Sequence, residues 1–86
     1  MTKIWSDEAW DEYLEWQTED RKTLKRINDL IKDIERNGVS KGIGKPELLK
    51  HRKAWSRRID EVNRLLYNIG ENNTLLIISC KGHYDE

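Results

Sequence analysis

The second half of the chain contains a carboxylate, a guanidinium and an imidazole, Glu47, Arg64 and His83, that together could cleave RNA without a metal ion. Such cleavage needs a base that takes the proton from the ribose 2′-hydroxyl and an acid that protonates the departing 5′-oxygen. It also needs a cation that stabilises the negative charge on the phosphorane between them. Lys50 and Arg58 could hold the flanking phosphates.

Tyr84 follows His83 directly and could stack on a base or hydrogen-bond a phosphate. Each of these residues also has an ordinary explanation. Glu47 would be a solvated strand residue, Arg64 a surface cation, and His83 a side chain at a frayed terminus. Residue types and spacing alone favour these ordinary explanations, so the catalytic hypothesis depends on elements that would bring the residues together.

The length and charge of the chain limit the number of domains and the kind of ligand that it can bind. Eighty-six residues are typical of one small domain, and we assign residues 1–86 to a single domain. Residues 1–20 hold seven acidic side chains and one basic, a net charge of −6, whereas residues 41–67 hold eight basic and three acidic, a net charge of +5. This asymmetry suggests a site for a polyanion. Pairing of opposite charges on a solvated surface would explain it equally well.

The only cysteine, Cys80, lies within an apolar run. A lone cysteine cannot form an internal disulfide or build a zinc site by itself, so we interpret Cys80 as a small buried hydrophobic residue. We expect no metal site and no cofactor. No stretch is apolar enough to span a membrane, and residues 1–10 lack the pattern of a secretion signal, which favours a cytoplasmic protein.

The first half of the chain predicts a short strand and two helices. Residues 3–5 form the strand candidate, and Ser6 is suited to cap a helix. The side of this helix predicted to face the core, flanked by Ala9 and Trp16, consists of Trp10, Tyr13, Leu14 and Gln17. A second helix over residues 20–36 carries an apolar stripe and stops at Asn37-Gly38. Two helices with a short join predict a helical hairpin.

After a flexible stretch at residues 38–46, the periodicity changes to that of strands. Four apolar-rich runs predict strands: residues 47–51, 55–60, 63–69 and 74–83, with a turn between the last two. The predicted fold class is α+β, in the order β-α-α-β-β-β-β, with the helical hairpin packed on one face of a mainly antiparallel sheet.

Alternation along these strands predicts which charged residues share a face. Arg64 points to the same side as Leu66 and Asn68, opposite three apolar neighbours, Leu65, Tyr67 and Ile69. By the same rule Arg58 lies on the side opposite Arg57, and His83 continues the last strand on the side of Ser79 and Lys81. We expect the face away from the helices to be partly polar and basic, and to hold the site.

Five segments carry a family resemblance: "IWSDEAWDEYLEWQ", "KRINDLIKDIER", "GKPELLKH", "WSRRIDEVNRLLY" and the "HY" near the end. In their order and spacing they resemble the YoeB branch of the RelE toxin superfamily across nearly the whole chain. The resemblance is specific, because no generic domain needs these residues together. It implies a microbial-ribonuclease-like, RelE-like fold with a helical hairpin against a twisted antiparallel sheet.

The resemblance also implies an activity, that of a metal-independent, ribosome-dependent mRNA endonuclease, or mRNA interferase. Such toxins cleave translated mRNA in the ribosomal A site by attack of the 2′-hydroxyl and thereby inhibit translation. Glu47 matches the family's general base, Arg64 the arginine that steadies the scissile phosphate, and His83 the general acid. Three further residues match positions that bind or orient RNA: Lys50, Arg58 and Tyr84.

The partners implied by the resemblance are a YefM-like antitoxin, the ribosome with its mRNA, and a second copy of the chain in a homodimer. The antitoxin's tail would cover or displace the C-terminal residues of the toxin, so the late position of the His-Tyr pair would suit conformational control. No membrane partner is implied.

The chain departs from the family pattern in two places. Only residues 52–54 separate "LKH" from "WSRR", fewer than in the family, which predicts a tighter hairpin. Asp85 and Glu86 follow the "HY" at which the family generally stops.

Two alternatives remain open: a non-nuclease toxin of the RelE/ParE superfamily that acts on DNA gyrase, and a degenerate homologue that still binds an antitoxin. The presence of an acid–base pair favours the nuclease, since a toxin that only binds a protein needs none.

Overall fold

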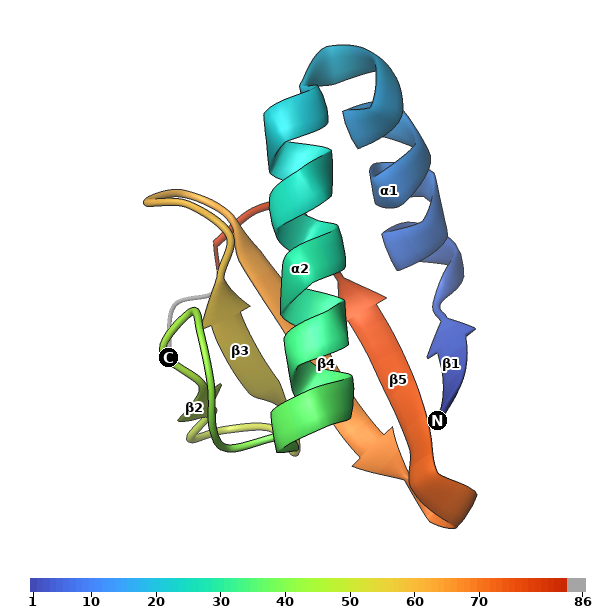
Figure 1. Cartoon of the computed structure of the whole chain (residues 1–86), viewed down its shortest axis with the longest axis vertical. Coiled ribbons are helices and arrows are strands. Elements are labelled where there is room, and N and C mark those ends of the chain that lie inside the picture. Colours follow the sequence, from blue (N-terminus) through green and yellow to red (C-terminus); the bar gives the residue numbers. More distant parts are fainter. Residues whose placement is uncertain (84–86) are drawn as a thin grey trace.

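The computed structural model describes residues 1–83, in which two helices pack on one face of a five-stranded sheet (Figure 1). The elements follow the chain as β1 (Thr2–Trp5), α1 (Asp7–Glu19), α2 (Arg21–Asn37), β2 (Glu47–Leu48), β3 (Trp55–Arg58), β4 (Arg64–Gly70), the 3-10 helix η1 (Glu71–Asn73) and β5 (Thr74–Ser79). The strands lie in the order β1-β5-β4-β3-β2, with β1 parallel to β5 and every other described pair antiparallel. The predicted α+β class and element order are confirmed.

A single residue, Asp20, joins the two helices. Its backbone N–H donates to the carbonyl of Trp16 at 3.0 Å and closes α1. Its carboxylate accepts hydrogen bonds from the N–H of Lys22 at 3.0 Å and the hydroxyl of Thr23 at 2.9 Å, which caps α2. The hydrogen bonds from Thr23 lower the pKa of Asp20. Because the chain reverses at one residue, α1 and α2 run side by side in opposite directions (Figure 1).

The prediction for the inner side of α1 is wrong for three of its four residues, because Trp10, Leu14 and Gln17 are exposed. Trp10 is 46% exposed and Leu14 43% exposed, whereas the flanking Ala9 and Trp16 are buried. The reason lies in the position of the helix, which packs on β5 and on β1 at the edge of the sheet. Only a narrow stripe of α1 is covered there. Helical periodicity predicts that a helix is amphipathic, but the width of the covered stripe depends on what lies beneath it.

The core lies between α2 and the middle of the sheet. The apolar stripe of α2 is buried as predicted, with Ile27, Leu30 and Ile34 fully enclosed. The sheet buries four side chains against it: Leu65, Tyr67, Leu75 and Ile77. Each such side chain contributes roughly 1.5–3 kcal/mol to stability. Neither helix among residues 1–83 is long and apolar enough to cross a membrane.

The strands that surround the candidate residues are shorter than predicted. β2 has two residues and β5 ends at Ser79, so His83 does not continue a strand. A register shift between Leu66 and Tyr67 precedes this end, because Leu66 pairs with Ser79 whereas Tyr67 pairs with Ile77. A bulge of this kind often ends strand pairing. Residues 80–82 form a bend after β5, and His83 follows this bend and not a strand.

Cys80 is fully buried, as predicted, with its Sγ 3.6 Å from the carbonyl oxygen of Ala9. Burial raises the pKa of its thiol from 9.0 to about 12. Because the thiolate is the reactive form, alkylation by iodoacetamide at pH 8 is expected to be about 1,000-fold slower than for an ordinary thiol. Mass spectrometry of the adduct in native buffer and in denaturing urea measures this. Equal rates in the two conditions would contradict the expectation.

Candidate functional site

Glu47, Arg58 and Arg64 share the face of the sheet that points away from the helices. Glu47 pairs with Ser56, and Arg58 pairs with Arg64, across two antiparallel ladders. Directly paired residues share a face, as do residues two apart on one strand. The neighbours Trp55, Leu65 and Tyr67 contact the core on the other face. Strand spacing puts the Cα atoms of Glu47 and Arg64 roughly 12 Å apart, so their side chains can approach one phosphate group from two sides.

Arg64 is held by the turn that precedes β4. Its Nη1 donates to the carbonyl oxygens of Asp60 at 2.6 Å and Asn63 at 3.1 Å. The Asp60 carboxylate fixes the turn by accepting from the N–H groups of Val62 at 2.8 Å and Asn63 at 2.6 Å. Burial works against the ionised form of Asp60, but the hydrogen bonds from Asn63 outweigh it and lower the pKa of this carboxyl. The turn therefore fixes a permanent positive charge on the site face.

His83 is brought next to Arg64 by the residue before it. The N–H of Arg64 donates to the carbonyl of Gly82 at 3.0 Å, and the N–H of Gly82 donates to Oδ1 of Asn63 at 2.8 Å. His83 is exposed and directly follows Gly82 in the chain. A bend held against β4, and not the predicted strand, thus places His83 beside Arg64.

The segment that leads to His83 is also anchored on α1. Cys80 donates its N–H to Oε1 of Glu12 at 2.8 Å, and its carbonyl accepts from Nε1 of Trp16 at 2.9 Å. Burial raises the pKa of Glu12, although the hydrogen bond from Cys80 works in the opposite direction. Both backbone groups of Cys80 are therefore bound by side chains of one helix.

Lys81 adds a second anchor between this segment and α1. Its Nζ lies 2.7 Å from Oε2 of Glu15 and 3.0 Å from Oε2 of Glu19, and 4.8 Å from the ring centroid of Trp16. The two carboxylates raise the pKa of Lys81. Two acidic residues of α1 thus pair with the C-terminal segment. Pairing of opposite charges on the surface, the ordinary explanation of the charge asymmetry, therefore accounts for part of the acidic charge of residues 1–20.

Lys50 lies in the short connection between β2 and β3 and is exposed. This connection is closed by a hydrogen bond of 2.9 Å from the N–H of Leu49 to the carbonyl of Ala54. Lys50 therefore sits at the same edge of the sheet as β2, close in the chain to the candidate carboxylate. Tyr84 lies outside the described residues, as do Asp85 and Glu86.

The middle of the site face is less open than predicted. Leu66 and Ser79 are fully buried there, and Ser56 is 9% exposed. Arg58 and Glu47 are exposed, and Arg64 is half-buried. The charged groups therefore gather at the end of the sheet formed by β2, the end of β3 and the start of β4.

Arg57, one of the basic residues counted in 41–67, is absent from this surface. Its side chain is fully buried and forms an ion pair with Asp33 of α2. Strand alternation predicts its inward direction, but we did not predict its partner. The sequence could have predicted this partner, because an arginine that points inward from a strand requires an acidic residue on the facing helix. Asp33, next to the buried Ile34, met that requirement.

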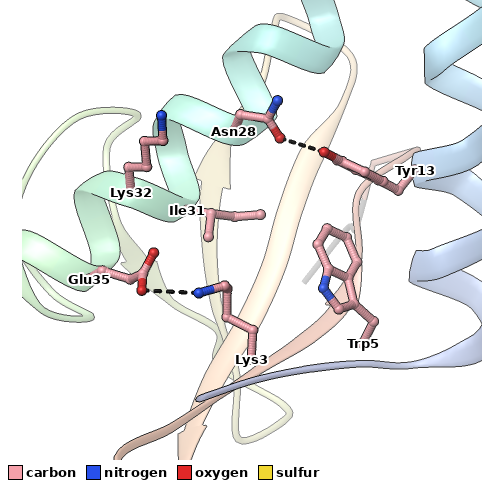
Figure 2. A pocket seen from close by; sticks show the side chains of 7 residues that line it. All are labelled: Lys3, Trp5, Tyr13, Asn28, Ile31, Lys32 and Glu35. Atoms are coloured by element: carbon pink, nitrogen blue, oxygen red, sulfur yellow. Dashed lines mark hydrogen bonds and ion pairs between the residues drawn. The ribbon is translucent and has the colours of Figure 1, made fainter. Parts of the chain in front are cut away.

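A groove of about 370 Å³ lies elsewhere, between β1, α1 and α2 (Figure 2). Figure 2 shows Lys3 facing Glu35, with Nζ 3.1 Å from Oε2, and Tyr13 donating to Oδ1 of Asn28 at 2.8 Å. These polar groups bind one another. Since β1 and β2 are opposite edges of the sheet, the groove is separate from the charged residues described above.

The arrangement can support acid–base chemistry on a phosphodiester. A carboxylate and an imidazole are able to exchange protons, and two guanidinium groups beside them are able to bind and stabilise a phosphate. Among residues 1–83, no three His, Cys, Asp or Glu side chains are grouped so that they could hold a metal ion.

Comparison with known proteins gives the family. Residues 5–84 match the family model of the YoeB-like toxin of bacterial type II toxin-antitoxin systems. The chain is 50% identical to Toxin YoeB of Escherichia coli (strain K12), over 98% of this chain and 100% of that protein. The YoeB dimer from Staphylococcus aureus has a TM-score of 0.91 at 42% identity, and the heterotetrameric YoeB-YefM toxin-antitoxin complex from the same organism 0.89 at 43%, each over 98% of both chains. The chain therefore belongs to the family of YoeB-like toxins of bacterial type II toxin-antitoxin systems.

Proposed function

We propose that this protein is a ribosome-dependent mRNA endonuclease that cuts translated mRNA in the ribosomal A site and so inhibits translation. The observation that carries the proposal is the register of the sheet, which gathers Glu47, Arg58 and Arg64 on one face. The contact between Gly82 and Arg64 adds His83 to this group. A toxin that acted only by binding a protein would have no use for a base, an acid and two phosphate-binding cations together.

In the proposed reaction, Glu47 takes the proton from the ribose 2′-hydroxyl, and the resulting oxygen attacks the adjacent phosphorus. Arg64 stabilises the charge of the phosphorane, and His83 gives a proton to the departing 5′-oxygen. The products are a 2′,3′-cyclic phosphate and a 5′-hydroxyl. Lys50 and Arg58 hold the flanking phosphates, and Tyr84 binds or orients a base.

The exposure of the site supports the proposed dependence on the ribosome. Glu47 and His83 are exposed on a surface, and the groove of Figure 2 is elsewhere. A site that does not enclose its substrate provides little orientation of the 2′-hydroxyl by itself, and orientation makes up a large part of the catalysis of such reactions. An mRNA that the ribosome already holds in one conformation would supply what this surface lacks.

The partners that we propose are a YefM-like antitoxin and a second copy of the chain, by analogy with the YoeB-YefM complex and the YoeB dimer from Staphylococcus aureus. Action on translating ribosomes places the protein in the cytoplasm. Exposed Trp10 and Leu14 on α1 would suit an interface with either partner. Sedimentation over a range of concentrations measures the dimer, and a monomer at micromolar concentration would contradict it.

Primer extension on an mRNA in a purified translation system tests the proposal. The expected result is a new cut within the codon being read, present with ribosomes, absent without them, and suppressed by the antitoxin. Translation that continues on uncut mRNA would reject the nuclease. A DNA supercoiling assay with gyrase would then be the next measurement.

Removal of Asp85 and Glu86 is expected to increase cleavage. Two carboxylates close to His83 in the chain would repel the incoming phosphate. Charges that act on one another through water do so weakly, so the expected gain is about two- to fivefold. Cleavage rates of the full chain and of a chain ending at Tyr84, measured at the same ribosome concentration, decide it. Equal or faster cleavage by the full chain would reject the repulsion.

A further inference from the structure

Arg57 uses all five of its N–H donors inside the protein, and most of them bind one loop. Its Nε donates to the hydroxyl of Tyr67 at 2.9 Å, and one Nη1 donor forms the ion pair with Asp33. The other three donate to backbone carbonyls of the 38–44 loop: Ile43 at 3.0 Å, Gly38 at 2.9 Å and Lys41 at 2.7 Å. A guanidinium has five such donors, so every one is satisfied. The loop is thus wrapped around a single buried side chain.

Tyr67 and Asp33 bind the same loop independently of Arg57. The hydroxyl of Tyr67 donates to the carbonyl of Val39 at 2.6 Å, and Asp33 accepts from the N–H of Ile43 at 3.0 Å. The wrapping leaves no space for a side chain at Gly42, since a Cβ there would lie 1.7 Å from Oδ2 of Asp33. Its φ of +118° is also one that favours glycine. This packing indicates that the loop has one conformation when the three side chains are in place.

The loop leads directly to Glu47, and three successive residues of β3 hold this part of the chain. The N–H of Arg58 donates to the carbonyl of Gly44 at 2.7 Å, Ser56 pairs with Glu47, and Arg57 between them binds the loop. The β2 strand that carries Glu47 is only two residues long. So short a strand has few ladder hydrogen bonds of its own. Its position therefore depends on what fixes the chain before it.

We propose that Arg57, together with Tyr67 and Asp33, is a positioning residue for Glu47, which holds the catalytic carboxylate on the site face through the 38–46 segment. The inference rests on the proposed role of Glu47 as general base. Arg57 itself is fully buried on the opposite face and does not touch the substrate. Its effect is on geometry, and a displacement of about 1 Å in a catalytic group can lower a rate about 100-fold.

Lysine cannot replace arginine in this role. Its ammonium group has three donors at one point, whereas the guanidinium spans acceptors on a strand, a helix and a loop. Arg57→Lys is therefore the severe variant. Tyr67→Phe is the mild one, because it removes only the hydroxyl that accepts from Arg57 and donates to Val39.

The test measures single-turnover cleavage of ribosome-bound mRNA as a function of toxin concentration, below the melting temperature of every variant. The control is Leu75→Val, a change in the core on β5. The conditions are chosen so that the melting temperature of Leu75→Val equals that of Tyr67→Phe. For Tyr67→Phe we expect a maximal rate about 10-fold lower with an unchanged half-saturating concentration, and for Arg57→Lys a larger loss. Leu75→Val is expected to cleave at the wild-type rate.

Hydrogen exchange of the Ile43 and Leu49 amides gives a second readout that does not depend on activity. Both amides are hydrogen-bonded in or just after the segment, to Asp33 and Ala54. They are expected to exchange faster in Tyr67→Phe than in Leu75→Val. Wild-type cleavage and unchanged exchange in Tyr67→Phe would overturn the inference. If the wild-type protein fails to cleave, the proposed function has failed, and unchanged exchange alone would still overturn the control of this segment by Tyr67 and Arg57.

Discussion

Replacing His83 with Gln is expected to lower the rate of mRNA cleavage on the ribosome by about 10²–10⁴-fold, and Glu47→Gln by a similar factor, because each removes one partner of general acid–base catalysis. Glutamine keeps much of the size and hydrogen bonding of both side chains, so the loss reports on proton transfer. The measurement is single-turnover cleavage followed by primer extension, with toxin in excess over ribosomes. Under those conditions release of the product does not limit the observed rate.

Two matched variants control for the loss of a histidine ring or of a carboxylate charge elsewhere in the chain. His51→Gln alters the other histidine of the chain, and Glu71→Gln alters an exposed carboxylate in η1, at the end of β4 far from Arg64. Both are expected to cleave within about twofold of the wild-type rate. The combination Glu47→Gln/His83→Gln is expected to cost less than the product of the single effects, since groups that act as a unit are not additive. A His83→Gln variant as active as His51→Gln would contradict the assignment of the general acid.

Local patterns predicted the parts of the fold whose causes are local. The second helix, its end near Asn37 and its buried stripe follow from residues three and four apart, and they appear in α2 almost unchanged. The same is true of the Ser6 cap, whose hydroxyl accepts from the N–H of Ala9 at 2.9 Å. Alternation within each strand predicted which neighbours Arg58 and Arg64 point away from, because a strand has a period of two. That the two arginines share one face follows from the register, in which Arg58 pairs with Arg64.

The predictions that failed concern contacts between distant parts of the chain. The end of β5 depends on the bulge opposite Leu66, and the covered side of α1 depends on its place above the edge of the sheet. His83 reaches its position through Cys80, whose N–H binds Glu12 from 68 residues away. No window of the sequence contains both ends of that contact. The residue types of the candidate site could therefore be predicted, but the backbone that places the imidazole could not.

Arg57→Ala is expected to destabilise the folded protein by about 3–5 kcal/mol, the usual cost of removing one partner of a buried ion pair. The substitution leaves the carboxylate of Asp33 without its guanidinium and the carbonyls of Gly38, Lys41 and Ile43 without donors. Domains of this size are stable by about 5–15 kcal/mol, so such a loss removes a large part of the total. Urea denaturation followed by tryptophan fluorescence measures the free energy of unfolding. The matched control is the next residue, Arg58→Ala, which removes an exposed guanidinium and is expected to change stability by less than about 0.5 kcal/mol.

The same ion pair gives the stability a dependence on acid. Burial alone would raise the pKa of Asp33, but the hydrogen bonds from Arg57, Ile43 and Asn37 outweigh it, so its pKa lies below the ordinary 3.8. The unfolded chain then binds a proton more readily than the folded one, and this contribution is present above about pH 4 and is lost as the pH falls below it. Asp33→Asn should therefore reduce the stability at neutral pH and make the loss of stability in acid less steep. Asp29→Asn, at a half-buried position of α2 whose ion pair with Lys25 lies on the surface, should change both quantities less. Unfolding of Arg57→Ala and Arg58→Ala at the same urea concentration would contradict the predicted loss of stability, and the buried guanidinium would then not hold the 38–44 loop.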